Sequence, residues 1–459
     1  MTPRTRRLLP GLVVVGGLLA FWLFRRAPSP PADRIAIQAY GPCADGTALL
    51  VSDLMQLQNR RMVLPHGTPP PEYVSRLLLQ LSREGDVLTV DARLDGRALP
   101  RQQGPPAMAL GGLAKALSLD PPGTDLVPVD PADGWELLDL AGRSQDEASA
   151  ALVARAQALV VREPGCTSAR LAFAGLFTRY LVEHMEADTL DAQLACEQNF
   201  QDGLAAKPAY PRFAALYAIH LSDVGRQREA LRLLQDALHR HADNAALLNA
   251  LAYAARTSGL LGLADRALER RADALGVPRG QSNLADNALL YAGKYRAFES
   301  GLATVPPGPM RSFYQGYARL LVGDHEGARP FFAEAKPGGL GSTLFVRLSE
   351  VYRLALDGRG MEANAALDKL ESERMWMHLP DGEFTFKLAE AYGFLGRPGE
   401  ALDVAERASV QGFGCSPWFE RAPFLSGARQ LPRWISLDGH LRERQKLLEE
   451  AFPVSSFPL

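Results

Sequence analysis

The sequence has few cysteines and few histidines, and its charges nearly balance. Cys43, Cys166, Cys196 and Cys415 are its four cysteines among 459 residues, and they form no CxxC pair. They are too few for a disulfide framework in a chain of this length, although one structural disulfide would be compatible with a location outside the cytoplasm. The formal net charge of −2 gives no reason to expect nucleic acid as a partner.

Short catalytic and metal-binding motifs are also missing. The sequence contains no HExxH, no paired cysteine ligands and no glycine-rich phosphate loop after a strand. His239 and His241 point to different faces of a helix, which makes a solvated helix end a better explanation than a metal site. His184 lies in the acidic segment EHMEAD, which fits a charged loop between helices. No histidine or acid is tied to Cys415 by its spacing in the sequence. Because these motifs are missing, we expect a protein without enzymatic activity, cofactor or metal ion.

The organising feature is a pattern that repeats after 34 residues. Gly225 is followed by Ala230 and Leu234, and Gly259 is followed by Ala264 and Leu268. A glycine turn between two amphipathic helices, recurring at this period, is the signature of the tetratricopeptide repeat (TPR). Each helical hairpin buries its second face only against its neighbours. The sequence therefore predicts a mainly α, TPR-type α-solenoid of five to seven units over 132–452, closed by a polar capping helix. Further turn glycines are Gly293, Gly323, Gly358 and Gly396.

The amino terminus carries an apolar run at 8–24 with arginines on both sides. As a helix it would reach roughly 26 Å, the short end of a membrane span. A cleaved signal peptide is the alternative, but Trp22, Phe24 and Arg25 stand where small residues should precede the cut. We expect an uncleaved transmembrane helix, with the tail 1–7 in the cytoplasm and a proline-rich linker at 25–33.

A small α/β unit is predicted from 34 to 120. Ile35, Ile37 and Ala39 alternate as one face of a strand, and a helix over 48–59 and a short strand at 61–64 follow. Strands at 74–82 and 87–94 flank the turn REGD, and a helix over 108–119 ends the unit. The segment 121–131, rich in proline and glycine, is expected to be a linker.

The order of these elements resembles the TolB-like domain that precedes TPR arrays in many bacterial signalling proteins. Gly85-Asp86, Leu88, Val90 and Leu94 match its hairpin, whereas Gln38-Ala39-Tyr40 departs from the Leu-Pro-Phe usual in its first strand. The helix around Trp135 and the tail from residue 418 resemble segments in the periplasmic half of CadC-like membrane-anchored regulators. The resemblance implies a bacterial inner-membrane, single-pass protein with its carboxy-terminal bulk in the periplasm. In those regulators a winged helix precedes the span, where this sequence has only residues 1–7.

The predicted partner-binding residues are Asn249, Tyr253 and Arg256. Their spacing places them on the concave side of an inner helix, where TPR proteins hold extended peptides. The amide, ring and guanidinium could contact a peptide backbone and its carboxylate, and an ordinary polar helix face is the alternative explanation.

The function that these features favour is a non-catalytic scaffold or sensor in the periplasm. It would bind a protein or peptide partner in envelope signalling or assembly. Two alternatives stay open: a small-molecule sensor in the crevice between the α/β unit and the solenoid, and an enzyme without a recognisable motif.

Overall fold

The computed structural model describes residues 35–58, 63–64, 75–143, 148–183, 190–207, 210–279, 286–305, 307–336, 342–374 and 381–459. The predicted tail 1–7, membrane anchor 8–24 and linker 25–33 lie outside these residues. Among the residues that are described, no helix is both long enough and apolar enough to cross a membrane.

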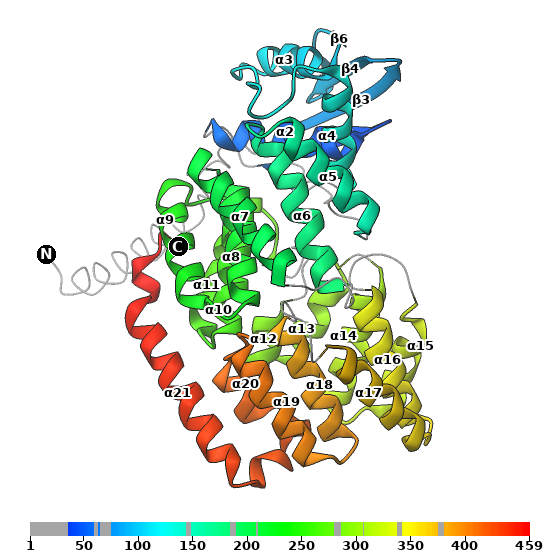
Figure 1. The fold of residues 1–459 in the computed structure, drawn as a ribbon, viewed down its shortest axis with the longest axis vertical. Coiled ribbons are helices and arrows are strands. Elements are labelled where there is room, and N and C mark those ends of the chain that lie inside the picture. The colour runs from blue at the N-terminus through cyan, green and yellow to red at the C-terminus, as the bar shows by residue number, and fades with distance from the viewer. Residues whose placement is uncertain are drawn as a thin grey trace, which may run out of the picture.

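A mixed sheet forms the amino-terminal unit, at the top of Figure 1. Strand β1 pairs in parallel with β2 and β3, and β3 pairs antiparallel with β4 across the turn at Gly85 and Asp86. The short strands β5 and β6, which the sequence did not predict, pair with β4. The elements are β1 (Ile35–Tyr40), α2 (Ala44–Leu57), β2 (Val63–Leu64), β3 (Ser75–Glu84), β4 (Val87–Leu94), β5 (Arg97–Ala98), β6 (Gln102–Gly104) and α3 (Pro106–Ala116).

The predicted hairpin and its buried face are confirmed. Leu88, Val90 and Ala92 of β4 are buried, as the alternation in the sequence indicates. Gly85 in the hairpin turn has a left-handed backbone conformation, with a φ of 58°. Glycine adopts this conformation without the strain that a Cβ would introduce.

Four helices connect the sheet to the repeats: α4 (Pro131–Arg143), α5 (Ala150–Arg162), α6 (Thr167–Glu183) and α7 (Leu190–Ala206). Helix α2 touches α4 closely, since a Cβ on Gly46 would lie 1.8 Å from the Leu138 carbonyl oxygen. The segment 121–131, expected to be a linker, is packed against the protein. Leu126 and Val127 are buried there, and one hydrophobic cluster runs from the sheet to the first repeats.

Six helical hairpins follow in the described part of the chain, and each turns at a predicted glycine. The φ angles of these glycines lie between 75° and 82°, a left-handed conformation that favours glycine. The predicted small residues Ala230, Ala264, Ala328 and Ala401 are fully buried. The TPR-type repeat is thereby confirmed by its own geometry. The pairs are α8 (Pro211–Asp223) with α9 (Gln227–Arg240), α10 (Ala245–Thr257) with α11 (Leu261–Leu275), α12 (Asn287–Tyr291) with α13 (Tyr295–Leu302), α14 (Pro309–Leu321) with α15 (His325–Glu334), α16 (Ser342–Leu356) with α17 (Gly360–Arg374), and α18 (Gly382–Phe394) with α19 (Pro398–Val410).

The last repeats fold back onto the first ones. The loop after α19 lies on the turn between α8 and α9, where Gln227 donates a hydrogen bond from its amide to the Gly412 carbonyl oxygen. The Gly414 amide donates to the Thr257 carbonyl oxygen at the end of α10, at 2.7 Å. A Cβ on Gly412 would lie 2.5 Å from the Ser222 carbonyl oxygen. The solenoid is therefore closed on itself.

The predicted capping helix is α21 (Arg433–Ala451), which follows α20 (Ser416–Arg421) and two short 3₁₀ turns, Pro423–Leu425 and Ala428–Gln430. Figure 1 shows it in red, returning from the last hairpins to the neighbourhood of α9. Leu441 packs in the hydrophobic cluster of the last repeats, and Leu448 packs in that of the first repeats. The helix thus covers the final repeat and also joins the two clusters.

Candidate binding centre around helix α18

Helix α18 is buried on every side. Each residue from Gly382 to Tyr392 has little or no contact with solvent, although an inner helix of an open solenoid would keep one face toward the groove. The helix carries polar side chains into this enclosed position. Buried polar groups are costly unless they find partners. We call the buried cluster formed by Glu383, Lys387, Glu390 and their partners the polar centre.

Glu383 is the meeting point of three helices. Arg256 of α10 donates from Nη2 to Oε2 at 2.8 Å and from Nε to Oε1 at 3.2 Å. Asn287 of α12 donates from Nδ2 to Oε1 at 3.0 Å, and the Tyr291 hydroxyl donates to the same oxygen. The side chain of Glu383 is 7% exposed and that of Arg256 is 18% exposed. This bidentate pair, with its further donors, joins helices that are far apart in the sequence.

Two other carboxyl groups lie beside this pair. Burial raises the pKa of Asp223 well above its usual range, and the charge of Asp381 adds to the effect. Burial also raises the pKa of Asp381 to about 6, with a further contribution from Glu383. Burial acts in the same direction on Glu383, but the charge and hydrogen bonds of Arg256 outweigh it and hold the pKa of Glu383 below its usual value. Glu383 is thus the carboxylate that Arg256 keeps ionised.

A second ion pair lies one to two turns further along α18. The Lys387 ammonium donates to Glu390 Oε2 at 2.9 Å, and the Tyr317 hydroxyl donates to Glu390 Oε1 at 2.6 Å. The side chains are 1% and 0% exposed. Lys387 Nζ also lies 4.2 Å from the centre of the Tyr317 ring, and the faces of Tyr291 and Trp418 are within 5.5 Å. Aromatic faces attract a cation most strongly where water is excluded.

The three residues predicted to bind a partner lie on one face of α10, and all are half-buried. Two of them join the polar centre. The Tyr253 hydroxyl donates to Asp223 Oδ1, and the Arg256 guanidinium lies 4.6 Å from the Tyr253 ring centre. Asn249 lies one turn before Tyr253 on the same helix. The carboxylate that we expected a peptide to offer to Arg256 is supplied by Glu383 of the same chain.

Sequence analysis missed the residues of α18 that complete this centre. Glu383, Lys387 and Glu390 have the spacing of one helical face, which by itself is typical of a solvated stripe. The missed signal was the rest of the helix. Phe384, Phe386 and Leu388 occupy the other faces and are buried, so no face was left to serve as a solvated one.

The crevice predicted between the α/β unit and the solenoid is bridged by direct contacts. Asp53 of α2 accepts a hydrogen bond from the Tyr210 hydroxyl at 2.9 Å and pairs with Arg212 Nη2 at 2.8 Å. The Asn244 amide donates to Gln56 Oε1 across the same boundary. These contacts join the α/β unit to the first repeats.

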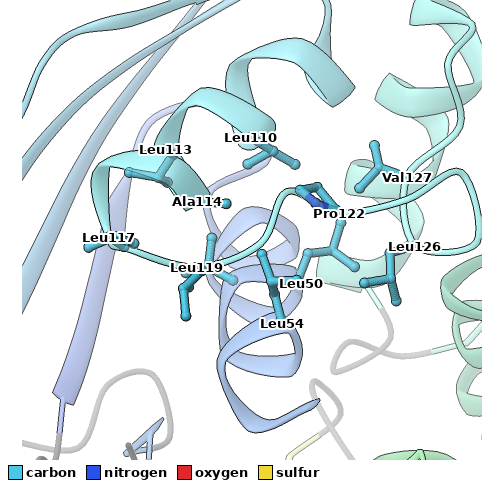
Figure 2. Close-up of a pocket in the computed structure, with 11 residues that line it drawn as sticks. Leu50, Leu54, Leu110, Leu113, Ala114, Leu117, Leu119, Pro122, Leu126 and Val127 are labelled. Atoms are coloured by element: carbon cyan, nitrogen blue, oxygen red, sulfur yellow. The ribbon is translucent and has the colours of Figure 1, made fainter. Parts of the chain in front are cut away.

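A narrow apolar cavity lies inside the α/β unit instead. It is enclosed by α2, α3 and the segment after α3, and the side chains labelled in Figure 2 point into it. Its volume of about 10 Å³ is comparable to the space for one water-sized sphere. The lining is apolar throughout: Leu50, Val51, Leu54, Leu110, Leu113, Ala114, Leu117, Leu119, Pro122, Leu126 and Val127.

The cysteines and acidic clusters of the described residues do not suggest covalent or metal chemistry. Cys43, Cys166, Cys196 and Cys415 are free thiols. Burial raises the pKa of Cys415 to about 12, which makes it a poor nucleophile because the thiolate is the reactive form. In the part of the chain that is described, no group of three or more His, Cys, Asp and Glu side chains could hold a metal ion.

The chain is similar to solved structures of helical-repeat proteins, but it matches no known protein family. No protein-family model matches the chain, and no curated protein matches it significantly. The human IFIT1 dimer with m7Gppp-AAAA is similar over 65% of this chain and 75% of its own, with 13% identity and a TM-score of 0.42. The TPR domain of P58(IPK) is similar over 69% and 95%, with 13% identity and a TM-score of 0.18. The repeat assignment accordingly stands on the hairpin geometry described above.

Proposed function

We propose that the chain is a non-catalytic binding scaffold whose partner contacts the inner face of α10 beside the polar centre. The observation that carries this proposal is the half-buried row of Asn249, Tyr253 and Arg256, next to charges that the fold holds in place. Glu383 fixes the orientation of the Arg256 guanidinium. A polar group that is already oriented loses little conformational freedom on binding, which favours affinity.

The proposed partner is a protein or peptide segment. Inner helices of helical repeats bind extended segments through polar contacts to the backbone and pockets for side chains. The Asn249 amide can both donate to and accept from a peptide group, and the Tyr253 ring offers an apolar surface with a polar tip. Because Glu383 neutralises Arg256, we expect the partner to present a backbone or neutral polar group there rather than a carboxylate.

We further propose that this scaffold acts at the bacterial envelope. The apolar run at 8–24 and its flanking arginines support an inner-membrane anchor with the repeats in the periplasm. A reporter that is active only in the cytoplasm, fused after Leu459, tests the orientation. Activity of that fusion would reverse the proposed topology, whereas activity of a periplasm-only reporter supports it.

The test of partner binding places a photocrosslinking amino acid at Asn249 of the full-length protein in cells. Arg256 is less suitable, because its removal leaves Glu383 buried without a cation. A matched control carries the same amino acid at Arg232, an exposed residue of α9. We expect one identified partner to be crosslinked from position 249, not from 232, and to copurify with the untreated wild-type protein. Equal crosslinking from both positions, or none, would contradict the proposal.

A further inference from the structure

Arg374 is a buried cation without a counter-ion among the described residues. It is the last residue of α17 and is 1% exposed. Its Nε, Nη1 and Nη2 atoms are buried and have no hydrogen-bond partner. The guanidinium lies against the Phe384 ring, whose centre is 4.9 Å from Cζ. Buried arginines are normally paired, because an isolated charge is strongly disfavoured away from water.

The carboxylates around Arg374 are already engaged. Glu371 pairs with Arg407 at 2.8 Å, and Glu373 pairs with Arg347. Asp381 contributes the largest favourable charge, but its Oδ1 accepts hydrogen bonds from the backbone amides of Glu383 and Phe384 and caps α18.

Charges of both signs surround Arg374, and Asp381 and Glu371 favour its charged form. Arg347 and Arg407 both disfavour the charged form of Arg374, and burial is the larger influence that lowers its pKa, to about 10. Arg407 Nη2 is also buried without a hydrogen-bond partner. Two neighbouring helices, α17 and α19, therefore hold guanidinium donors that the described protein does not satisfy.

We propose that Arg374, at the end of α17, binds the oxyanion group, carboxylate or phosphate, of a small ligand. The guanidinium has five N–H donors in a planar fork that matches both groups. The Phe384 ring lies against the guanidinium, an arrangement in which Arg remains charged and oriented. The Arg407 Nη2 donor is the candidate second contact. This site is separate from the partner surface at Asn249 and does not depend on it.

The experiment measures thermal unfolding of the full-length protein in sodium phosphate or sodium acetate, with sodium chloride at equal ionic strength as the reference. A ligand that binds the folded state raises the Tm in a saturable way. We expect such a rise in the wild type with phosphate, with acetate or with both. The two anions distinguish a phosphate-bearing ligand from a carboxylate-bearing one.

Three variants locate the response. In chloride alone, Arg374→Met should melt above the wild type, because it removes an uncompensated charge. It should also weaken anion binding by roughly 10- to 100-fold, as expected for loss of a charged hydrogen bond. Arg374→Lys keeps the charge and should retain part of the response. Arg228→Gln, an exposed arginine at the start of α9, should respond like the wild type.

The absence of any saturable response to either anion in the wild type would overturn the proposal, whatever the variants do. A response that Arg374→Met retains, or that Arg228→Gln abolishes, would also overturn it. An Arg374→Met protein that melts below the wild type in chloride would contradict the premise that the charge of Arg374 is uncompensated. Crosslinking from position 249 in the same variant reports separately on the partner surface.

Discussion

The first and last hairpins share one helical unit but have different interiors. In α9, α10 and α11 the fully buried side chains are alanines and leucines, such as Ala230, Ala250 and Leu251. Between α14 and α20 the interior is aromatic and ionic, with Tyr317 and Trp418 around the Lys387–Glu390 pair. These two sets of residues belong to separate hydrophobic clusters.

This difference shows how a repeat array acquires a fixed shape. Apolar contacts are non-directional and roughly proportional to buried area, so they stack one hairpin on the next without fixing where the array ends. Buried charges require specific partners at hydrogen-bond distance. The pairing of Arg256 with Glu383 therefore specifies that the last repeats meet the first, while the aliphatic contacts supply most of the stacking.

The largest expected effect comes from placing a charge in the aliphatic half. Ala230→Asp buries a carboxylate with no cation beside it, and we expect a loss of about 3–5 kcal/mol or cooperative unfolding of α8–α11. Urea denaturation followed by circular dichroism measures it. Arg228→Asp on the exposed side of α9 is the control and should change stability little. An unchanged midpoint for Ala230→Asp would refute the assigned packing.

The last repeats should lose stability when one member of the buried Lys387–Glu390 pair is removed. Lys387→Met leaves Glu390 buried without its cation, at an expected cost of about 3–5 kcal/mol. The double variant Lys387→Met/Glu390→Leu removes both charges and should lose clearly less than the sum of the two single changes. Denaturation of the four proteins gives the comparison. Additive losses would mean that the two side chains do not act as a pair.

A pH-dependent effect of about 3 kcal/mol is expected at Asp381. Burial raises the pKa of Asp381 to about 6 in the folded protein, above the usual 3.8 of an aspartate, so the folded state holds the proton more tightly. Its contribution to stability is full below about pH 4 and is lost as pH rises through about 6.

Asp381→Asn keeps an oxygen that can cap α18 and removes this titration. The variant should gain stability relative to the wild type between pH 4 and 6, as measured by urea midpoints across that range. A constant difference at all pH values would exclude titration of Asp381 in this window.

The smallest loss of stability should come from breaking an exposed ion pair in the α18–α19 hairpin, which also contains the polar centre. Glu400 accepts from Arg397 at 3.0 Å on the surface of α19. Glu400→Gln should cost at most about 1 kcal/mol, because water already solvates both charges. A loss as large as that of Lys387→Met would show that burial does not set the value of these pairs.

The sequence predicted the repeat unit because its signals are local. Gly225 and Gly259 mark the turns, and Ala230 and Ala264 mark the close helix contacts at fixed offsets. The β-hairpin around Gly85 could be predicted in the same way, because apolar and polar residues alternate over its short strands. Each of these features depends only on residues within one hairpin, so a single sequence is enough to predict it.

Closure of the solenoid could not be predicted in the same way. The partner of Arg256 lies 127 positions away, and no periodicity connects the two. Sequence spacing placed Tyr253 and Arg256 on the inner face of α10, but only the fold brings Glu383 of α18 to them. The proline and glycine content of 121–131 predicts a linker for a related reason, since composition says nothing about what covers Leu126 in the fold.

The most direct test of the account is a double-mutant cycle on Arg256 and Glu383. The changes are Arg256→Met, Glu383→Gln and the two together, with unfolding free energies measured in urea. A hydrogen-bonded buried pair that closes the solenoid predicts a coupling energy of about 2 kcal/mol or more. A coupling within about 0.5 kcal/mol of zero would contradict contact between α10 and α18, and with it the closed form of the molecule.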